Sequence, residues 1–181
     1  MPVFISLLRG INVSGHRMIS MADLKALYQS LGYTNVRSYL QSGNVVFDAS
    51  SAKPAKYSAA IAKAIAAELG HQVTVVVKTA EELRRITASN PFTRLATIDP
   101  QFLHATFLAA IPKGLSLKQL KLPLQGKEAA HQIDDVLYLY CPNGYGRTRI
   151  NNSFFEKQFS TQATTRNWRT VTALDGLAHA G

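Results

Sequence analysis

The stretch NVRSYLQSGNVVFD, residues 35–48, decides the fold of this chain. Two runs rich in β-branched and aromatic residues, Asn35 to Leu40 and Val45 to Asp48, predict strands on either side of it. Between them, the Ser42-Gly43 pair is typical of a tight turn. The stretch therefore predicts a β-hairpin, and the residues around it decide what kind of sheet it joins.

Helices and strands alternate regularly around this hairpin. Before it, Pro2 to Leu8 predicts a strand, and a helix with Ser20 as its N-cap runs until Gly32 stops it. After it, the alanine-rich stretch Tyr57 to Leu69 predicts a helix, and Gln72 to Lys78 predicts a strand with four valines. The resulting order, β-α-β-β-α-β, is that of a ferredoxin-like lobe.

A weaker copy of this pattern follows along the chain. Thr79 and Glu82 form a capping box for a helix that ends near Asn90-Pro91. The later elements are expected at Phe102–Ala109 (strand), Ser116–Leu122 (short helix), Glu128–Ile133 and Val136–Cys141 (hairpin), Phe154–Phe159 (helix) and about Asn167–Ala178 (last helix). We therefore predict an α+β protein: a ferredoxin-like βαββαβ lobe at residues 1–92 and a related βαββα lobe with a C-terminal helix at residues 93–181. The two lobes are expected to be tightly associated or to form one domain.

Composition excludes several classes of protein. Hydrophobic residues make up 46% of the chain and charged residues 17%, which is a globular balance, and no apolar run is long enough to cross a bilayer. Residues 1–8 lack a basic leader and a cleavage site, so a cytoplasmic location without a membrane partner is expected.

The single cysteine, Cys141, excludes a disulfide within the chain and is expected to be a buried strand thiol. The five histidines show no metal-ligand spacing, so neither a metal nor a cofactor is expected.

Several motifs resemble one family. They are RGINVSGH at residues 9–16, YLQSGNVVF at 39–47, SNPF at 89–92, YCPNGYGRTRINN at 140–152 and ATTRNWRTV at 163–171. In this order they are similar to the bacterial family catalogued as domain of unknown function number 1697, over roughly Val3 to Leu174. The resemblance implies an α+β fold with ferredoxin-like lobes, and it implies no activity, cofactor or catalytic residues. The family's first loop usually carries paired glycines, whereas this chain has Ser14 before Gly15, so serine would strain that loop or add a hydroxyl.

Strand directions bring one set of polar side chains together. In a ferredoxin-like sheet, the first crossover and the first hairpin end at the same edge, so the loop at residues 9–20 and the turn at residues 41–44 are expected to meet there. This set comprises Arg9, Asn12, Ser14, His16, Arg17, Gln41, Ser42 and Asn44. A glycine-bearing loop beside a helix N-terminus suits an anion. The alternative is structural: the glycines serve the turns, and the asparagines bond their own backbone.

Two later basic segments are further candidates. Arg147 and Arg149 lie in a glycine-bearing loop before a helix, which suits an anion but also fits a solvated turn. Arg166 and Arg169 flank Trp168, and an arginine on an indole could hold a phosphate or a base. The only tryptophan of the chain is, however, favoured as a core anchor of the last helix.

The function stays open between three alternatives. The net charge of +9 favours an anionic partner, such as a nucleotide, a phosphorylated metabolite or a nucleic acid. An RNA-recognition mode is disfavoured because, besides Phe4 and Phe47, the central strands lack the aromatic-rich pattern. The second alternative is a small-molecule enzyme with His16 or His71 as acid or base, and the third is an oligomeric interaction module.

Overall fold

The computed structural model describes residues 1–50 and 53–180. These form two compact units: the first contains residues 1–85 and the end of the chain from Leu174, and the second contains Ile86–Ala173. The predicted boundary after residue 92 differs from this division, in which the end of the chain belongs with its beginning. The division into lobes at residues 1–92 and 93–181, tightly associated or forming one domain, stays a prediction.

The first unit is built on a four-stranded antiparallel sheet. Its strands lie in the order β2-β3-β1-β4. Their bounds are β1 Val3–Leu8, β2 Thr34–Tyr39, β3 Asn44–Asp48 and β4 Val75–Thr79. The helices of this part of the chain are α1 Met21–Ser30, α2 Pro54–Leu69 and α3 Ala80–Ser89. The predicted hairpin and the elements on either side of it are thus present.

Local signals set the helix ends as predicted. The Ser20 side chain accepts a hydrogen bond from the backbone N–H of Asp23 at the start of α1. At α3, the N–H of Thr79 donates to the Glu82 carboxylate at 2.7 Å, and the N–H of Glu82 donates to the Thr79 hydroxyl at 3.0 Å. Both are capping interactions that satisfy N–H groups without a partner inside the helix.

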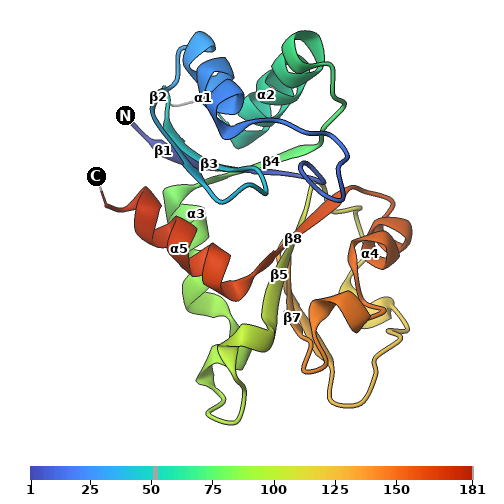
Figure 1. Cartoon of the computed structure of the whole chain (residues 1–181). Coiled ribbons are helices and arrows are strands. Elements are labelled where there is room, and N and C mark those ends of the chain that lie inside the picture. The colour runs from blue at the N-terminus through green and yellow to red at the C-terminus, as the bar shows by residue number, and fades with distance from the viewer. Residues whose placement is uncertain (51–52, 181) are drawn as a thin grey trace. The chain divides into compact units, whose positions relative to one another are not determined.

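Both faces of the first sheet are buried. Figure 1 shows α1 and α2 covering one face, where Phe4 and Phe47 pack with Tyr28 of α1 and Tyr57 of α2. The strand residues that point the other way, such as Ile5, are also buried. Because Phe4 and Phe47 lie under helices, they are not available for stacking on bases.

The second unit repeats the strand order with different helices. Its sheet runs β6-β7-β5-β8, all antiparallel. The bounds are β5 Leu103–Leu108, β6 Ala129–Ile133, β7 Val136–Tyr140 and β8 Ala163–Asn167, with α4 Asn152–Phe159 and, continuing past the unit, α5 Trp168–Ala178. The chain is thus α+β, as predicted, and the ferredoxin-like label stays an interpretation of the strand order.

Two predictions for the second unit were wrong. A fourth strand, β8, occupies residues that were assigned to no element, because the five residues ATTRN are too few to show a strand period yet pair along β5. The expected helix Ser116–Leu122 is only a short 3-10 turn, Leu117–Gln119, because the backbone is already extended at Leu120, ahead of Pro123. The last helix does begin after Asn167, whose side chain accepts from the N–H of Thr170 at 2.8 Å.

Candidate functional site

The loop between β1 and α1 has an unusual backbone. Five of its residues have φ in the left-handed region: Gly10 (63°), Asn12 (55°), Ser14 (50°), Gly15 (76°) and Arg17 (48°). Three of the five carry side chains, and such residues rarely adopt this conformation because of steric cost. Backbone strain of this kind persists only where surrounding contacts hold it, and it gathers at functional sites.

Asn12 holds this loop in place. Its side-chain amide donates to the carbonyl of Gln41 at 2.7 Å and to that of Ile19 at 2.9 Å, while its side-chain oxygen accepts from the N–H of Ile19 at 2.8 Å. The bond to Gln41 joins the loop to the turn between β2 and β3, so the predicted meeting of these two segments is confirmed. Residues 9–20 and 40–43 together are called the rim below.

Gly43 closes the rim from the side of the turn. Its carbonyl accepts a hydrogen bond from the N–H of Leu8 at 2.9 Å. A Cβ atom at this position would lie 2.7 Å from the Cβ of Leu8 and 2.8 Å from the Cδ1 of Ile11, and its φ is 76°. Only glycine fits here, because the turn lies directly against the end of β1.

The predicted rim residues divide into two groups. Asn12 and Asn44 serve the structure: the buried Asn44 amide donates to the Tyr39 carbonyl and to the Ser42 hydroxyl, both at 2.9 Å. The others lie nearer the solvent. Arg9 is half-buried and its N–H donates to the Thr74 carbonyl at 2.9 Å, whereas the exposed members are Ser14, His16, Arg17, Gln41 and Ser42.

Arg17 and His71 differ in their relation to the loop. The Arg17 guanidinium lies over the backbone of Gly10, since its Nη1 atom is 3.4 Å from where a Cβ would stand. A cation therefore accompanies the left-handed segment. His71 is half-buried and follows Gly70, whose φ is 72°. It comes shortly before Thr74, whose carbonyl accepts from Arg9. Among the described residues, no hydrogen bond or ring contact joins the His71 side chain to the rim, so its position assigns it no role.

Sequence patterns alone did not reveal that the rim also exposes apolar side chains. Val13, Met18 and Leu40 have 56%, 63% and 57% of their surface exposed. Leu40 also has φ of 60°, which is rare for a residue with a large side chain. Large exposed apolar side chains gathered on one edge mark a binding surface more often than scattered ones. Val13 and Leu40 stand in the sequence motifs, but Leu40 was assigned to the end of a strand, so its exposure was not predicted.

In the second basic loop, which contains Arg147 and Arg149, side chains of the loop already bond the N–H groups at the start of α4. Arg147 and Arg149 are exposed, as expected for a loop. However, the Asn151 side chain accepts from the N–H of Phe154 at 3.1 Å, and the Tyr145 hydroxyl accepts from the N–H of Asn152 at 3.2 Å. Because these donors are engaged, this helix start offers less to an anion than predicted.

The motif around Trp168 is largely internal. Trp168 has only 6% of its surface exposed and packs edge-on against Tyr138, with ring centroids 6.2 Å apart. Arg166 is also buried, and its Nη1 donates to the Thr164 hydroxyl at 2.6 Å and to the Thr165 carbonyl at 3.0 Å. Burial lowers the pKa of Arg166 to about 10. Only Arg169 of this group is exposed, so no open arginine–indole platform exists.

Reactive groups elsewhere are buried or occupied. Cys141 follows β7, is fully buried, and burial raises the pKa of its thiol to about 11, so it is a poor nucleophile. Among the residues that the structure describes, no three His, Cys, Asp or Glu side chains could hold a metal ion together. No helix in the same residues is long and apolar enough to cross a membrane.

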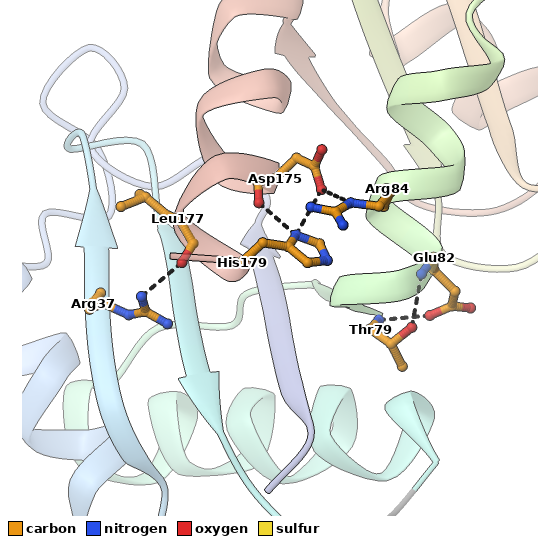
Figure 2. A network of polar contacts seen from close by, with 7 residues as sticks. All are labelled: Arg37, Thr79, Glu82, Arg84, Asp175, Leu177 and His179. Atoms are coloured by element: carbon orange, nitrogen blue, oxygen red, sulfur yellow. Dashed lines mark hydrogen bonds and ion pairs between the residues drawn. The ribbon is translucent and has the colours of Figure 1, made fainter. Parts of the chain in front are cut away.

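A polar network ties the end of the chain into the first unit (Figure 2). The Arg37 guanidinium of β2 donates to the carbonyl of Leu177 at 2.7 Å. The Nδ1 atom of His179 lies 3.1 Å from the Asp175 carboxylate, and the Nε of Arg84 lies 3.9 Å from it. The spacing of Asp175 and His179, four residues apart at a helix end, is the sequence signal for this pair, which was not singled out.

Comparison with known proteins supports the family and the fold. Residues 1–138 match the family described as "Protein of unknown function (DUF1697)". The two later motifs, at residues 140–152 and 163–171, lie outside the matched residues. A structure titled as that of a conserved bacterial protein from Streptococcus pneumoniae has a TM-score of 0.73 and 20% identity, and the match covers 98% of each chain. No curated protein sequence matches significantly.

Proposed function

The chain belongs to the family of proteins of unknown function DUF1697, and we propose that it binds an anionic small molecule at the rim. The observation that carries the proposal is the left-handed loop held rigid by Asn12, with the Arg17 cation lying over it. The N–H groups of Asn12 and His16 already bond the carbonyls of Arg17 and Val13, so the anion would use other N–H groups of the loop, whose glycines let it approach closely. The net charge of +9 adds a long-range attraction.

The exposed apolar side chains narrow the kind of ligand. Val13, Met18 and Leu40 offer surface to a planar or apolar group beside the cation. A nucleotide or a phosphorylated metabolite with an apolar part would use both features, whereas inorganic phosphate would use only one. Longer nucleic acids are less favoured, because residues 9–20 and 40–43 contain no Phe, Tyr or Trp side chain on which successive bases could stack.

A binding titration tests the proposal. Isothermal titration at low salt with AMP, ATP and inorganic phosphate should show saturable binding of a nucleotide and weaker binding of phosphate. Arg17→Ala should weaken nucleotide binding roughly 10- to 150-fold, because a charge-assisted hydrogen bond contributes roughly 1.5–3 kcal/mol. Arg94→Ala removes the same charge from an exposed residue outside the rim and should change little.

Two outcomes would refute the proposal: no saturable binding at low salt, or equal losses in the two arginine variants. A single-stranded oligonucleotide that binds more tightly than ATP, with a steep salt dependence, would shift the ligand from a nucleotide to nucleic acid. An acid–base role for His16 or His71 is not part of the proposal, because residues 9–20 contain no carboxylate to orient an imidazole.

The same apolar side chains support a second candidate, an interface between copies of this chain. Burying Val13, Met18 and Leu40 against a partner would remove apolar surface from water. Light scattering over a range of protein concentrations distinguishes the candidates. A stable dimer that Met18→Gln dissociates supports the interface, and a monomer at every concentration rules it out.

A further inference from the structure

A hollow lies at the edge of the first sheet opposite the rim. It has a volume of about 650 Å³ and lies where β1 begins and β3 ends. Its polar lining comes from Lys25 and Gln29 of α1, Asn35 and Arg37 of β2 and Asp48 of β3. Hollows of this size commonly accept small molecules.

The backbone is irregular at this hollow. The pairing of β2 with β3 shifts register between Thr34 and Arg37, and Asn35 has φ of 47°. A bulge redirects the side chains beside it, and it is over-represented next to functional sites. Here the irregular residue, Asn35, lies beside Asp48: its side-chain amide donates to Asp48 Oδ2 at 2.6 Å.

The other carboxylate oxygen of Asp48 is the unusual group. Asp48 Oδ1 is buried and accepts no hydrogen bond from the residues that the structure describes. A buried acceptor without a partner costs free energy, more so when it carries charge. Because Asp48 also lines the hollow, its carboxylate retains acceptor capacity for an N–H donor of a ligand.

Cations line the same hollow. Arg37 is fixed there because its Nη1 donates to the Leu177 carbonyl at 2.7 Å (Figure 2). Its Nε also donates to the Asn35 carbonyl at 3.3 Å. Lys25 lies on the exposed side of α1. A guanidinium in a defined place and a mobile ammonium are both suited to a carboxylate.

We propose that this hollow binds a zwitterion of the amino-acid type, either a free amino acid or a short peptide. Its ammonium group donates to the Asp48 carboxylate, its carboxylate accepts from Arg37 and Lys25, and its side chain packs on Val3 and Val36. The site is independent of the rim, since it lies at the other ends of β1 and β3.

Ligand variants test the two charges separately. Phenylalanine and the dipeptide Ala-Phe are titrated into the full chain and followed by the backbone amide signals of Gln29, Asn35 and Asp48 in NMR spectra. Saturable shifts confined to this edge are expected for at least one of the two. N-acetylphenylalanine, which lacks the ammonium, and phenylalaninamide, which lacks the carboxylate, should each bind about tenfold more weakly.

Protein variants give the matched control. Asp48→Asn should weaken binding of the zwitterion without changing that of N-acetylphenylalanine. Lys25→Gln should weaken binding, whereas Lys63→Gln, which removes an exposed lysine from α2, should not. If Asp48→Asn unfolds the chain, Lys25→Gln and the two modified ligands still decide the question. No saturable shift with either zwitterion, or equal binding of the acetylated ligand, overturns the proposal.

Discussion

The two sheets carry matching polar residues in their central strands, yet they satisfy them differently. On the helix-covered face, β1 presents Phe4, Ser6 and Leu8, and β5 presents His104, Thr106 and Leu108 in the same register with the fourth strand. Ser6 bonds the Tyr28 hydroxyl of α1 at 2.6 Å, and Thr106 bonds the Thr165 hydroxyl of β8 at 2.7 Å.

This difference follows from the helices. The first unit has α1 after its first strand, whereas the second has only the 3-10 turn Leu117–Gln119 at that place. Without a helical tyrosine, the hydroxyl of Thr106 is satisfied by a neighbouring strand, and Thr165 in turn donates to Asn152 of α4 at 2.6 Å. One strand order can therefore be completed by different helices, provided that each buried hydroxyl finds a partner.

The largest effect on stability is expected at Gly43, in the turn between β2 and β3 that lies against the end of β1. Gly43→Ala should lower the free energy of unfolding by about 2–4 kcal/mol, because a new Cβ meets Leu8 and Ile11 and φ is unfavourable. Gly15→Ala has the same φ of 76° but no neighbour within 4 Å, so about 1 kcal/mol is expected. Urea unfolding measures both, and equal losses would contradict the close contact at Gly43.

The hydroxyl pairs give the next effect. Thr165→Val removes bonds to Thr106, Asn152 and Tyr145, so a loss of about 2–3 kcal/mol is expected. Tyr28→Phe removes only the bond between the Tyr28 and Ser6 hydroxyls, so a loss of about 1 kcal/mol in the free energy of unfolding is expected. Thermal and urea unfolding of the two variants compare them. A larger loss for Tyr28→Phe would show that the first sheet depends more on its hydroxyl pair.

Two serines with φ of 50° provide a smaller test. Ser14 lies in the rim and Ser160 ends α4. Glycine relieves left-handed strain but loses more entropy on folding, so each serine-to-glycine variant should gain about 0.5 kcal/mol. Calorimetry measures the gain, and nucleotide titration separates the sites: a loss of affinity in Ser14→Gly alone would assign its hydroxyl to the ligand.

The smallest expected effect is a dependence of stability on pH that arises from His104 in the second unit. Burial lowers the pKa of His104, so the unfolded chain binds more protons below the ordinary value near 6.5. The free energy of unfolding is therefore not reduced by His104 above a pH of about 6.5, and it decreases as the pH falls towards 5. His104→Phe copies Phe4 of the first sheet and should flatten the melting temperature between pH 7 and 5. An unchanged slope would show that other groups cause the dependence.

Residues that act on their near neighbours were predictable from the sequence. Ser20, the Thr79–Glu82 pair and Asn167 all cap helices as expected, since a cap needs only the next three residues. The meeting of the rim loop with the β2–β3 turn also followed from strand direction alone. These features need no knowledge of long-range packing.

What depends on register or packing could not be predicted. The strand β8 is defined by its pairing with β5, and the hollow near Asp48 depends on a bulge in β2. The burial of Arg166 and Trp168, and the exposure of Met18, likewise depend on what covers each residue. The sequence indicated which residues were basic or apolar, but not which ones the fold would cover.

The first unit is discontinuous along the chain, because Leu177 supplies a hydrogen-bond acceptor to Arg37 across 140 residues. During synthesis, the ribosome must therefore add the whole stretch from Ile86 to Ala173 before this unit can be completed. At about 5–20 residues per second, β2 waits roughly 7–28 s for Leu177. In that interval Arg37 and the edge of the sheet around it are open to chaperones or to pairing with another nascent chain.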